Sequence, residues 1–191
     1  MKLILASQSP RRKELLGLLG ILFEIQVSQA DETMDPNGDP AQQVAEVSRR
    51  KALATCAEEE DVVVAADTIV VCDGKILGKP HSKEEAVRML SMLSGRSHFV
   101  MTGVTVRRGE QIHSCTEITE VFFRELSQRE ILRYVESGDP MDKAGAYGIQ
   151  GGAALFAEKL QGDYYNVMGL PVCRLTQMLK AAVPELMEDK Q

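Results

Sequence analysis

Tryptophan is absent from this chain of 191 residues, and the other large aromatics are few, with five phenylalanines and four tyrosines. Proteins that bind single-stranded nucleic acid stack bases on aromatic side chains beside a basic groove. The formal net charge of −6 also disfavours non-specific binding to nucleic acid or to an anionic membrane surface. We therefore expect neither nucleic acid nor a membrane as a partner.

Cysteine and histidine are also scarce. The four cysteines form no CxxC pair, and the three histidines show no spacing typical of metal ligands. We interpret the cysteines as reduced thiols of a cytoplasmic protein. No apolar run is long enough to span a bilayer, and the N-terminus leads straight into a predicted strand without the apolar segment of a signal peptide.

Several common catalytic motifs are missing as well. The sequence contains no GxxxxGK[ST] phosphate-binding loop and no set of protein-kinase motifs. It also lacks a GxSxG nucleophile elbow. These absences disfavour a motor ATPase, a kinase and a serine hydrolase.

The first informative stretch is Ser7-Gln8-Ser9-Pro10-Arg11-Arg12, which follows a predicted buried strand and precedes a helical apolar pattern. Ser9 suits the N-cap position, and Pro10 suits the first helical position. The unpaired amides of a first helical turn, with two guanidinium groups beside them, attract phosphate. The alternative is a capped surface helix with solvated arginines, and these six residues alone favour neither.

A lysine lies at the edge of the next apolar helical face. The segment Phe23–Val27 predicts a second strand, which runs into an acidic loop containing Glu32. Asp39 and Pro40 then begin a helix predicted to extend to about Glu59. One stripe of this helix consists of Val44, Val47, Lys51 and Ala54. Such a lysine either extends its ammonium to water or meets an anion.

A carboxylate interrupts the most hydrophobic part of the chain. Val62–Ala66 predicts a central strand covered on both faces, and a second apolar run, Ile69–Cys72, follows Asp67 and Thr68. We predict that Asp67 lies in a break between two buried strands. Its burial is costly unless a cation pairs with it. Asp67 is therefore a general base, a metal ligand or, as the plainer alternative, a residue that caps a turn.

The second half of the chain predicts a long hairpin, Ser97–Arg107 and Gln111–Phe123, and then a segment of small residues, Asp139–Gly152. That segment has no amphipathic period. It is either a functional loop, in which small residues let the backbone approach a ligand, or a flexible crossover. Ala153–Lys159 and Tyr164–Val167 predict a closing hairpin.

Candidate charged residues all fall at predicted strand ends or helix starts. Positive groups neutralise phosphates, and carboxylates bind Mg²⁺ and orient a water molecule. The inventory is therefore suited to a triphosphate with a divalent metal, and hydrolysis by water fits best, although spacing does not show which phosphorus is attacked. The cations are Arg11, Arg12, Lys51, Lys79 and Lys143, and the carboxylates are Glu32, Asp67 and Asp142.

Taken together, four segments resemble the Maf family of nucleoside triphosphate pyrophosphatases, and the likeness extends from Leu3 to about Leu179. The segments are Ser7–Arg12, Ala65–Thr68, Lys79-Pro80 and Asp142–Gly151. The resemblance implies one Maf-like domain over residues 1–191, with an elongated, mixed and twisted α/β sheet flanked by helices. It also implies two interleaved lobes with a central cleft, an architecture similar to that of inosine triphosphate pyrophosphatases, and a homodimer.

The resemblance further implies hydrolysis of a nucleoside triphosphate to the monophosphate and pyrophosphate with Mg²⁺ or Mn²⁺. Asp67 matches the proton acceptor, and Glu32 and Asp67 are expected near the metal. Arg11, Thr68 and Gln150 match positions credited with substrate choice. The remaining expected substrate-binding residues are Ser7, Ser9, Arg12, Lys51, Lys79, Asp142 and Lys143. Asp142 is either a further carboxylate of the site or a partner that fixes Lys143.

The sequence of Ala146–Gln150 resembles that of the branch of the family that acts on dTTP and UTP. Modified pyrimidine triphosphates are further candidate substrates. A glutamine amide offers a donor and an acceptor, which can match the imide edge of uracil or thymine. The family is also linked to arrest of septum formation and to the removal of non-standard nucleotides. A nucleotide-sensing regulator of division, in which catalysis is secondary, is therefore the alternative function.

Overall fold

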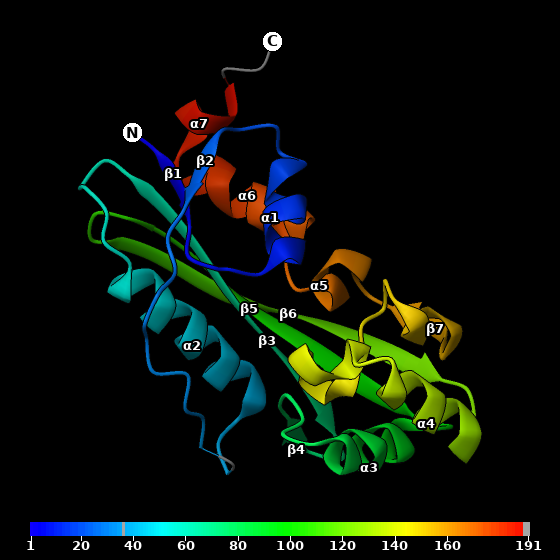
Figure 1. Ribbon diagram of the computed structural model, residues 1–191. Helices are drawn as coiled ribbons and strands as arrows, with labels where there is room; N and C mark the ends of the chain where they lie inside the picture. The colour runs from blue at the N-terminus through cyan, green and yellow to red at the C-terminus, as the bar shows by residue number, and fades with distance from the viewer. Residues whose placement is uncertain (36, 189–191) are drawn as a thin grey trace. The chain divides into compact units, whose positions relative to one another are not determined.

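The computed structural model describes residues 1–35 and 37–188. Within these residues the protein has a mixed, twisted seven-stranded sheet flanked by helices, which confirms the predicted fold class (Figure 1). The elements are β1 (Leu3–Leu5), α1 (Pro10–Gly17), β2 (Phe23–Ile25), α2 (Pro40–Ala54), β3 (Val62–Cys72), β4 (Lys75–Leu77), α3 (Lys83–Leu93), β5 (Ser97–Arg108), β6 (Gln111–Phe123), α4 (Gln128–Glu136), the 3-10 turns η1 (Asp139–Asp142), η2 (Ala144–Ala146) and η3 (Gly152–Leu155), β7 (Ala157–Gln161), α5 (Tyr164–Met168), α6 (Val172–Ala182) and α7 (Pro184–Glu188).

The described strands pair in the order β2-β1-β3-β5-β6-β7, and β4 pairs with β3. The chain divides into two compact units that alternate along the sequence, with boundaries inside β3, β5 and β6. Unit 1 contains Met1–Asp67, Thr102–Glu117 and the described part of Gly169–Gln191. Unit 2 contains Thr68–Met101 and Ile118–Met168.

Unit 1 contains a parallel three-strand core in which β1 lies between β2 and β3. Because β1-α1-β2 and β2-α2-β3 are successive parallel crossovers that run in opposite directions along the sheet, right-handed connections place α1 and α2 on opposite faces. Figure 1 shows this arrangement, with α6 on the same side as α1. Ligands of open α/β sheets bind beyond the carboxyl ends of the strands at such a switch point.

Helix α2 is held against the β5–β6 hairpin of unit 1 by polar as well as apolar contacts. The buried hydroxyls of Ser48 and Thr105 are 2.7 Å apart, and Thr116 donates to the carbonyl of Ala41 at 2.6 Å. At Gly103 the two backbones approach so closely that an added Cβ would lie 2.5 Å from the carbonyl carbon of Val44. The position of α2 is therefore fixed by the hairpin of β5 and β6.

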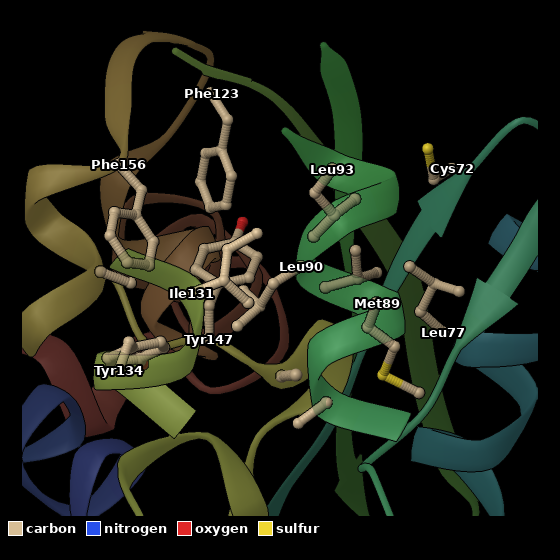
Figure 2. Close-up of a cluster of buried hydrophobic side chains, with 14 of the residues drawn as sticks. Cys72, Leu77, Met89, Leu90, Leu93, Phe123, Ile131, Tyr134, Tyr147 and Phe156 are labelled. Atoms are coloured by element: carbon tan, nitrogen blue, oxygen red, sulfur yellow. The ribbon is translucent and has the colours of Figure 1, made fainter. Parts of the chain in front are cut away.

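Unit 2 has its own apolar core, built between α3, α4, β6 and the segment that follows α4 (Figure 2). Leu90 and Leu93 of α3 are completely buried in it. Its aromatic side chains meet edge to face, with ring centroids 4.8 Å apart for Phe123 and Tyr147 and 5.2 Å apart for Tyr134 and Phe156. Edge-to-face pairs stabilise a core beyond the area that they bury. Tyr147, within the segment Asp139–Gly152, and Tyr134, in the helix before it, are thereby anchored.

His98 is the polar residue at the centre of this core. Its Nε2 lies 2.8 Å from the hydroxyl of Tyr147, and its side chain is 1% exposed. Burial lowers the pKa of His98 from 6.5 to about 4. The imidazole is therefore neutral in the folded protein at neutral pH.

The free energy of unfolding should consequently fall between pH 6.5 and pH 4, because the unfolded chain binds a proton at His98 that the folded chain excludes. A shift of this size corresponds to about 3 kcal/mol. Urea unfolding measures the free energy of unfolding across this pH range. The part of its decrease that His98 causes should be absent in His98→Phe. It should remain in His113→Gln, because His113 is exposed. Equal acid loss in wild type and His98→Phe would contradict the assignment.

Three predicted features differ from the structure. Asp67 and Thr68 do not separate two strands, because β3 is continuous from Val62 to Cys72. Helix α2 ends at Ala54 instead of near Glu59. The predicted strand at 164–167 is a helix, α5, so β7 has no hairpin partner there and pairs with β6 instead.

The two predicted N-caps are confirmed, because Ser9 and Asp39 each accept a hydrogen bond from the first turn of α1 and α2. Ser82 caps α3 in the same way. Ser127 and Glu130 form a complete capping box. All four cysteines are free thiols, and no described helix is long and apolar enough to cross a membrane.

Candidate active site

The turn between β1 and α1 fixes Arg12 at the carboxyl end of β1. Ser7 Oγ accepts a hydrogen bond from the Ser9 amide at 3.2 Å and from the Arg12 guanidinium at 3.4 Å. Arg12 Nε donates to the carbonyl of Gly169 at 2.8 Å. Burial lowers the pKa of Arg12, against the opposing effect of Asp67 and Glu32, but a guanidinium stays charged at neutral pH. Arg12 is therefore a positioned cation.

Lys51 contacts both Glu32 and Asp67, two carboxylates that are 35 residues apart in the sequence. Its Nζ lies 2.6 Å from Asp67 Oδ1 and 3.0 Å from Glu32 Oε1. The Lys51 side chain is 9% exposed, so the ammonium does not extend into water. Of the two alternatives for this lysine, the structure supports the one in which it meets an anion.

The two carboxylates differ in their surroundings. The Asp67 side chain, held in the middle of a central strand, is 14% exposed, whereas that of Glu32, in the loop after β2, is 59% exposed. The pairing of Asp67 with Lys51 compensates for the cost of burying a carboxylate among apolar strands. Asp67 is thus a rigid, shielded carboxylate, and Glu32 is an accessible one.

Sequence reasoning missed Arg50, which holds the loop that carries Glu32. Its guanidinium lies 3.5 Å from Asp31 Oδ2 and donates to the carbonyl of Thr33 at 3.0 Å. Asp31 in turn accepts from the Thr33 amide at 2.9 Å. Arg50 and Lys51, at one end of α2, therefore contact three consecutive residues of this loop, Asp31, Glu32 and Thr33. No local pattern in the sequence signals these contacts, because the two segments are far apart in the chain.

In unit 2 three of the predicted residues, Asp142, Lys143 and Gln150, belong to the segment that follows α4. Lys79 is exposed, and the carbonyl of the preceding Gly78 accepts a hydrogen bond from the Gly145 amide at 3.0 Å. Lys143 Nζ contacts Asp142 Oδ1 at 2.7 Å. Gln150 is exposed. Thr68 is half-buried on β3, directly after Asp67.

The structure thus places the candidates in two groups. Unit 1 holds the turn, the lysine bridge and the base candidate, and unit 2 holds the loop residues. The first group is Ser7, Ser9, Arg11, Arg12, Glu32, Lys51 and Asp67, and the second is Thr68, Lys79, Asp142, Lys143 and Gln150.

The sequence matches the model of the Maf-like protein family over residues 2–182. The chain belongs to this family. Proteins named dTTP/UTP pyrophosphatase from Bacillus pumilus and Bacillus velezensis are each 50% identical to it over 180 residues, covering 94% of this chain and 95% of the relative. The family match crosses both units.

Two solved structures share the fold of this Maf-like chain. A HAM1 protein from Coxiella burnetii aligns with a TM-score of 0.50 at 14% identity, over 95% of this chain and 100% of that one. The Ham1 protein of Staphylococcus aureus aligns with a TM-score of 0.53 at 12% identity, over 95% of this chain and 99% of that one.

The donor set of the Maf-like chain fits one kind of metal site. Mg²⁺ is usually held by one or two carboxylates together with water and substrate phosphates. Glu32 and Asp67 converge on one cation, the Lys51 ammonium, so they are the right number and type of ligand. Among the described residues, no group of three or more histidine, cysteine, aspartate and glutamate side chains could hold an ion. Glu32 and Asp67 would hold a divalent metal together with water and substrate phosphates.

Proposed function

We propose that this Maf-like protein is a nucleoside triphosphate pyrophosphatase that hydrolyses dTTP and UTP to the monophosphate and pyrophosphate. The observation that carries the proposal is the Lys51 bridge, which holds Asp67 and Glu32 together just beyond the point where the parallel pairing of β1 with β3 ends. The relatives at 50% identity, which are named dTTP/UTP pyrophosphatase, support the same activity and substrates.

Asp67 is the proposed proton acceptor. A water molecule attacks the triphosphate, the P–O bond between the α and β phosphates breaks, and pyrophosphate leaves with the bonding electron pair. The water proton passes to the Asp67 carboxylate. A rigid carboxylate orients the water before the reaction, which lowers the entropic part of the barrier.

Cations of unit 1 are proposed to bind the phosphates. Two of the three N–H groups of Lys51 are directed to carboxylates, and the third is proposed to donate to a phosphate oxygen. Arg11 and Arg12, with the hydroxyls of Ser7 and Ser9, supply further donors at the helix start. These donors stabilise charge that grows on the leaving pyrophosphate.

The remaining assignments complete the proposal. Glu32 and Asp67 would hold Mg²⁺ or Mn²⁺, which when bound neutralises charge on the phosphate oxygens. Lys79 would add a phosphate contact, and Thr68 and Gln150 would contribute to nucleotide choice. The whole of residues 1–191 is proposed to form one Maf-like domain, which acts as a homodimer in the cytoplasm and binds neither nucleic acid nor membranes.

The purified chain with Mg²⁺ should release pyrophosphate, and not inorganic phosphate, from dTTP and UTP. We expect kcat/KM for these two to exceed that for dCTP and dATP by at least about tenfold, because a wrong base leaves polar groups unpaired. Chelation by EDTA should abolish turnover, and added Mn²⁺ should restore it. Nucleotide binding without pyrophosphate release would instead support the alternative function, a nucleotide-sensing regulator of division. The proposed homodimer is tested separately by light scattering.

A further inference from the structure

Lys143 has acceptors for all of its N–H groups within its own loop. Its Nζ lies 2.6 Å from the carbonyl of Asp139, 3.0 Å from Asp139 Oδ1 and 2.7 Å from Asp142 Oδ1. An ammonium has three protons to donate. The side chain is 12% exposed. Unlike Lys51, it would have to break one of these hydrogen bonds to contact a phosphate.

The same network reaches the segment that carries Gln150. The hydroxyl of Tyr134 donates to Asp139 Oδ2 at 2.6 Å and accepts a hydrogen bond from the Gly148 amide at 3.2 Å. Burial alone would raise the pKa of Asp139, but the hydrogen bonds from Tyr134 and Lys143 outweigh it and the pKa is lowered. Lys143, Asp139 and Tyr134 therefore form one charged, connected chain of hydrogen bonds that ends at Gly148.

Two glycines let the backbone close over this network. An added Cβ at Gly148 would lie 2.5 Å from Lys143 Cε, and one at Gly151 would lie 2.7 Å from Asp139 Oδ2. The Gly151 amide donates to the carbonyl of Gly148 at 3.0 Å, which closes the turn. The absence of a side chain at Gly148 and Gly151 thus lets the backbone lie directly against Lys143 and Asp139.

We propose that Tyr134, Asp139 and Lys143 position the turn Gly148–Gly151, and with it Gln150, and that Lys143 is a positioning residue and not a phosphate ligand. The inference rests on the proposed function, in which Gln150 reads the base. It assigns Asp142 the second of its two roles, that of a partner that fixes Lys143.

Loss of the network should change base discrimination and leave phosphate binding intact. A glutamine amide distinguishes the imide edge of thymine from the amino edge of cytosine only while its orientation is fixed. If the turn loosens, the amide can rotate to suit either edge. Phosphate contacts made by unit 1 residues do not depend on this turn.

The experiment compares Tyr134→Phe and Lys143→Met with wild type, using three measurements. These are kcat/KM for dTTP, kcat/KM for dCTP, and the inhibition constant of inorganic tripolyphosphate, a probe that has no base. We expect the dTTP-to-dCTP ratio to fall about tenfold in each variant, the effect of losing one hydrogen bond to a charged group. The tripolyphosphate constant should stay within about twofold of wild type. The double variant should lose little more than either single variant, because both remove the same network.

Lys159→Met is the matched control, because it removes an exposed lysine of unit 2 that only lies over the Phe122 ring. It should change none of the three quantities. A tenfold weaker tripolyphosphate constant in Lys143→Met would make Lys143 a phosphate ligand and overturn the proposal. Unchanged discrimination in Tyr134→Phe would overturn it as well.

Failure of the proposed function is distinguishable. If the wild-type chain releases no pyrophosphate from any triphosphate, the pyrophosphatase assignment fails, and the positioning role is judged by amide hydrogen exchange of residues 144–151. Faster exchange there in both variants supports the network. Exchange equal to that of wild type in both variants overturns it.

Discussion

Replacing Asp67 with asparagine is expected to lower kcat for dTTP hydrolysis by at least about a thousandfold while nucleotide binding stays measurable. The amide has nearly the same size as the carboxylate and can remain beside Lys51, 2.6 Å from its Nζ in the wild type. It cannot accept a proton from water. Pyrophosphate release measures turnover, and isothermal titration with dTTP measures binding.

Asp73→Asn is the control for this substitution. Asp73 follows the same strand in an exposed turn, where it pairs with the exposed Arg96, and its φ of 50° is a conformation that asparagine tolerates well. The identical chemical change there should leave kcat within about twofold, the scatter expected of a surface substitution. Near-wild-type turnover in Asp67→Asn would remove Asp67 from its proposed role, whereas loss of both turnover and folded structure would show that the Lys51 bridge is needed for folding.

The assignment of Asp67 and not Glu32 as the proton acceptor follows from their burial. A general base must hold one orientation toward the attacked phosphorus, and Asp67 is fixed by β3 and by Lys51. Glu32 lies in a loop, more than half exposed, and its orientation depends on Lys51 and on the neighbours that Arg50 holds. An accessible carboxylate of this kind is better suited to a metal that arrives with its substrate.

Features set by neighbouring residues could be predicted from the sequence. The starts of α1 and α2 were predicted correctly, because an N-cap side chain bonds to an amide only three residues further along the chain. The apolar helical stripe that contains Lys51 predicted an ammonium near buried surface. The apolar strand that precedes Asp67 likewise predicted a carboxylate near buried surface. What remained undetermined was whether the two would meet, because their contact spans 16 residues and depends on how α2 packs on the sheet.

The wrong predictions have long-range causes. The sequence after Ala54 favours helix through Glu59, but Arg107 donates to the carbonyl of Thr55 at 2.9 Å and so satisfies the end of α2 from a distant strand. Asp67 and Thr68 were predicted to interrupt the strand. However, β3 is continuous and has a neighbouring strand on each side in the sheet. The network of Tyr134, Asp139 and Lys143 depends on the fold of the 3-10 turns, which no helical or strand period predicts.

Gly103→Ala is expected to unfold the protein or to lower its free energy of unfolding by several kcal/mol, because overpacking against backbone cannot be relieved by a rotamer change. The new Cβ would lie 2.5 Å from the Val44 carbonyl carbon and 2.7 Å from the Ala45 amide nitrogen. These backbone atoms belong to α2, so the helix itself would have to move. Any folded fraction should have lost pyrophosphate release, because moving α2 separates Lys51 from Asp67.

Gly17→Ala makes the same chemical change where nothing lies within 4 Å of the added methyl group. Because Gly17 is the last residue of α1, alanine should leave stability unchanged or raise it by up to about 1 kcal/mol. Urea unfolding followed by circular dichroism compares the two variants. A Gly103→Ala protein as stable and as active as Gly17→Ala would show that α2 can shift without disturbing the bridge between Lys51 and Asp67, and would make the rigid placement of that lysine unnecessary for catalysis.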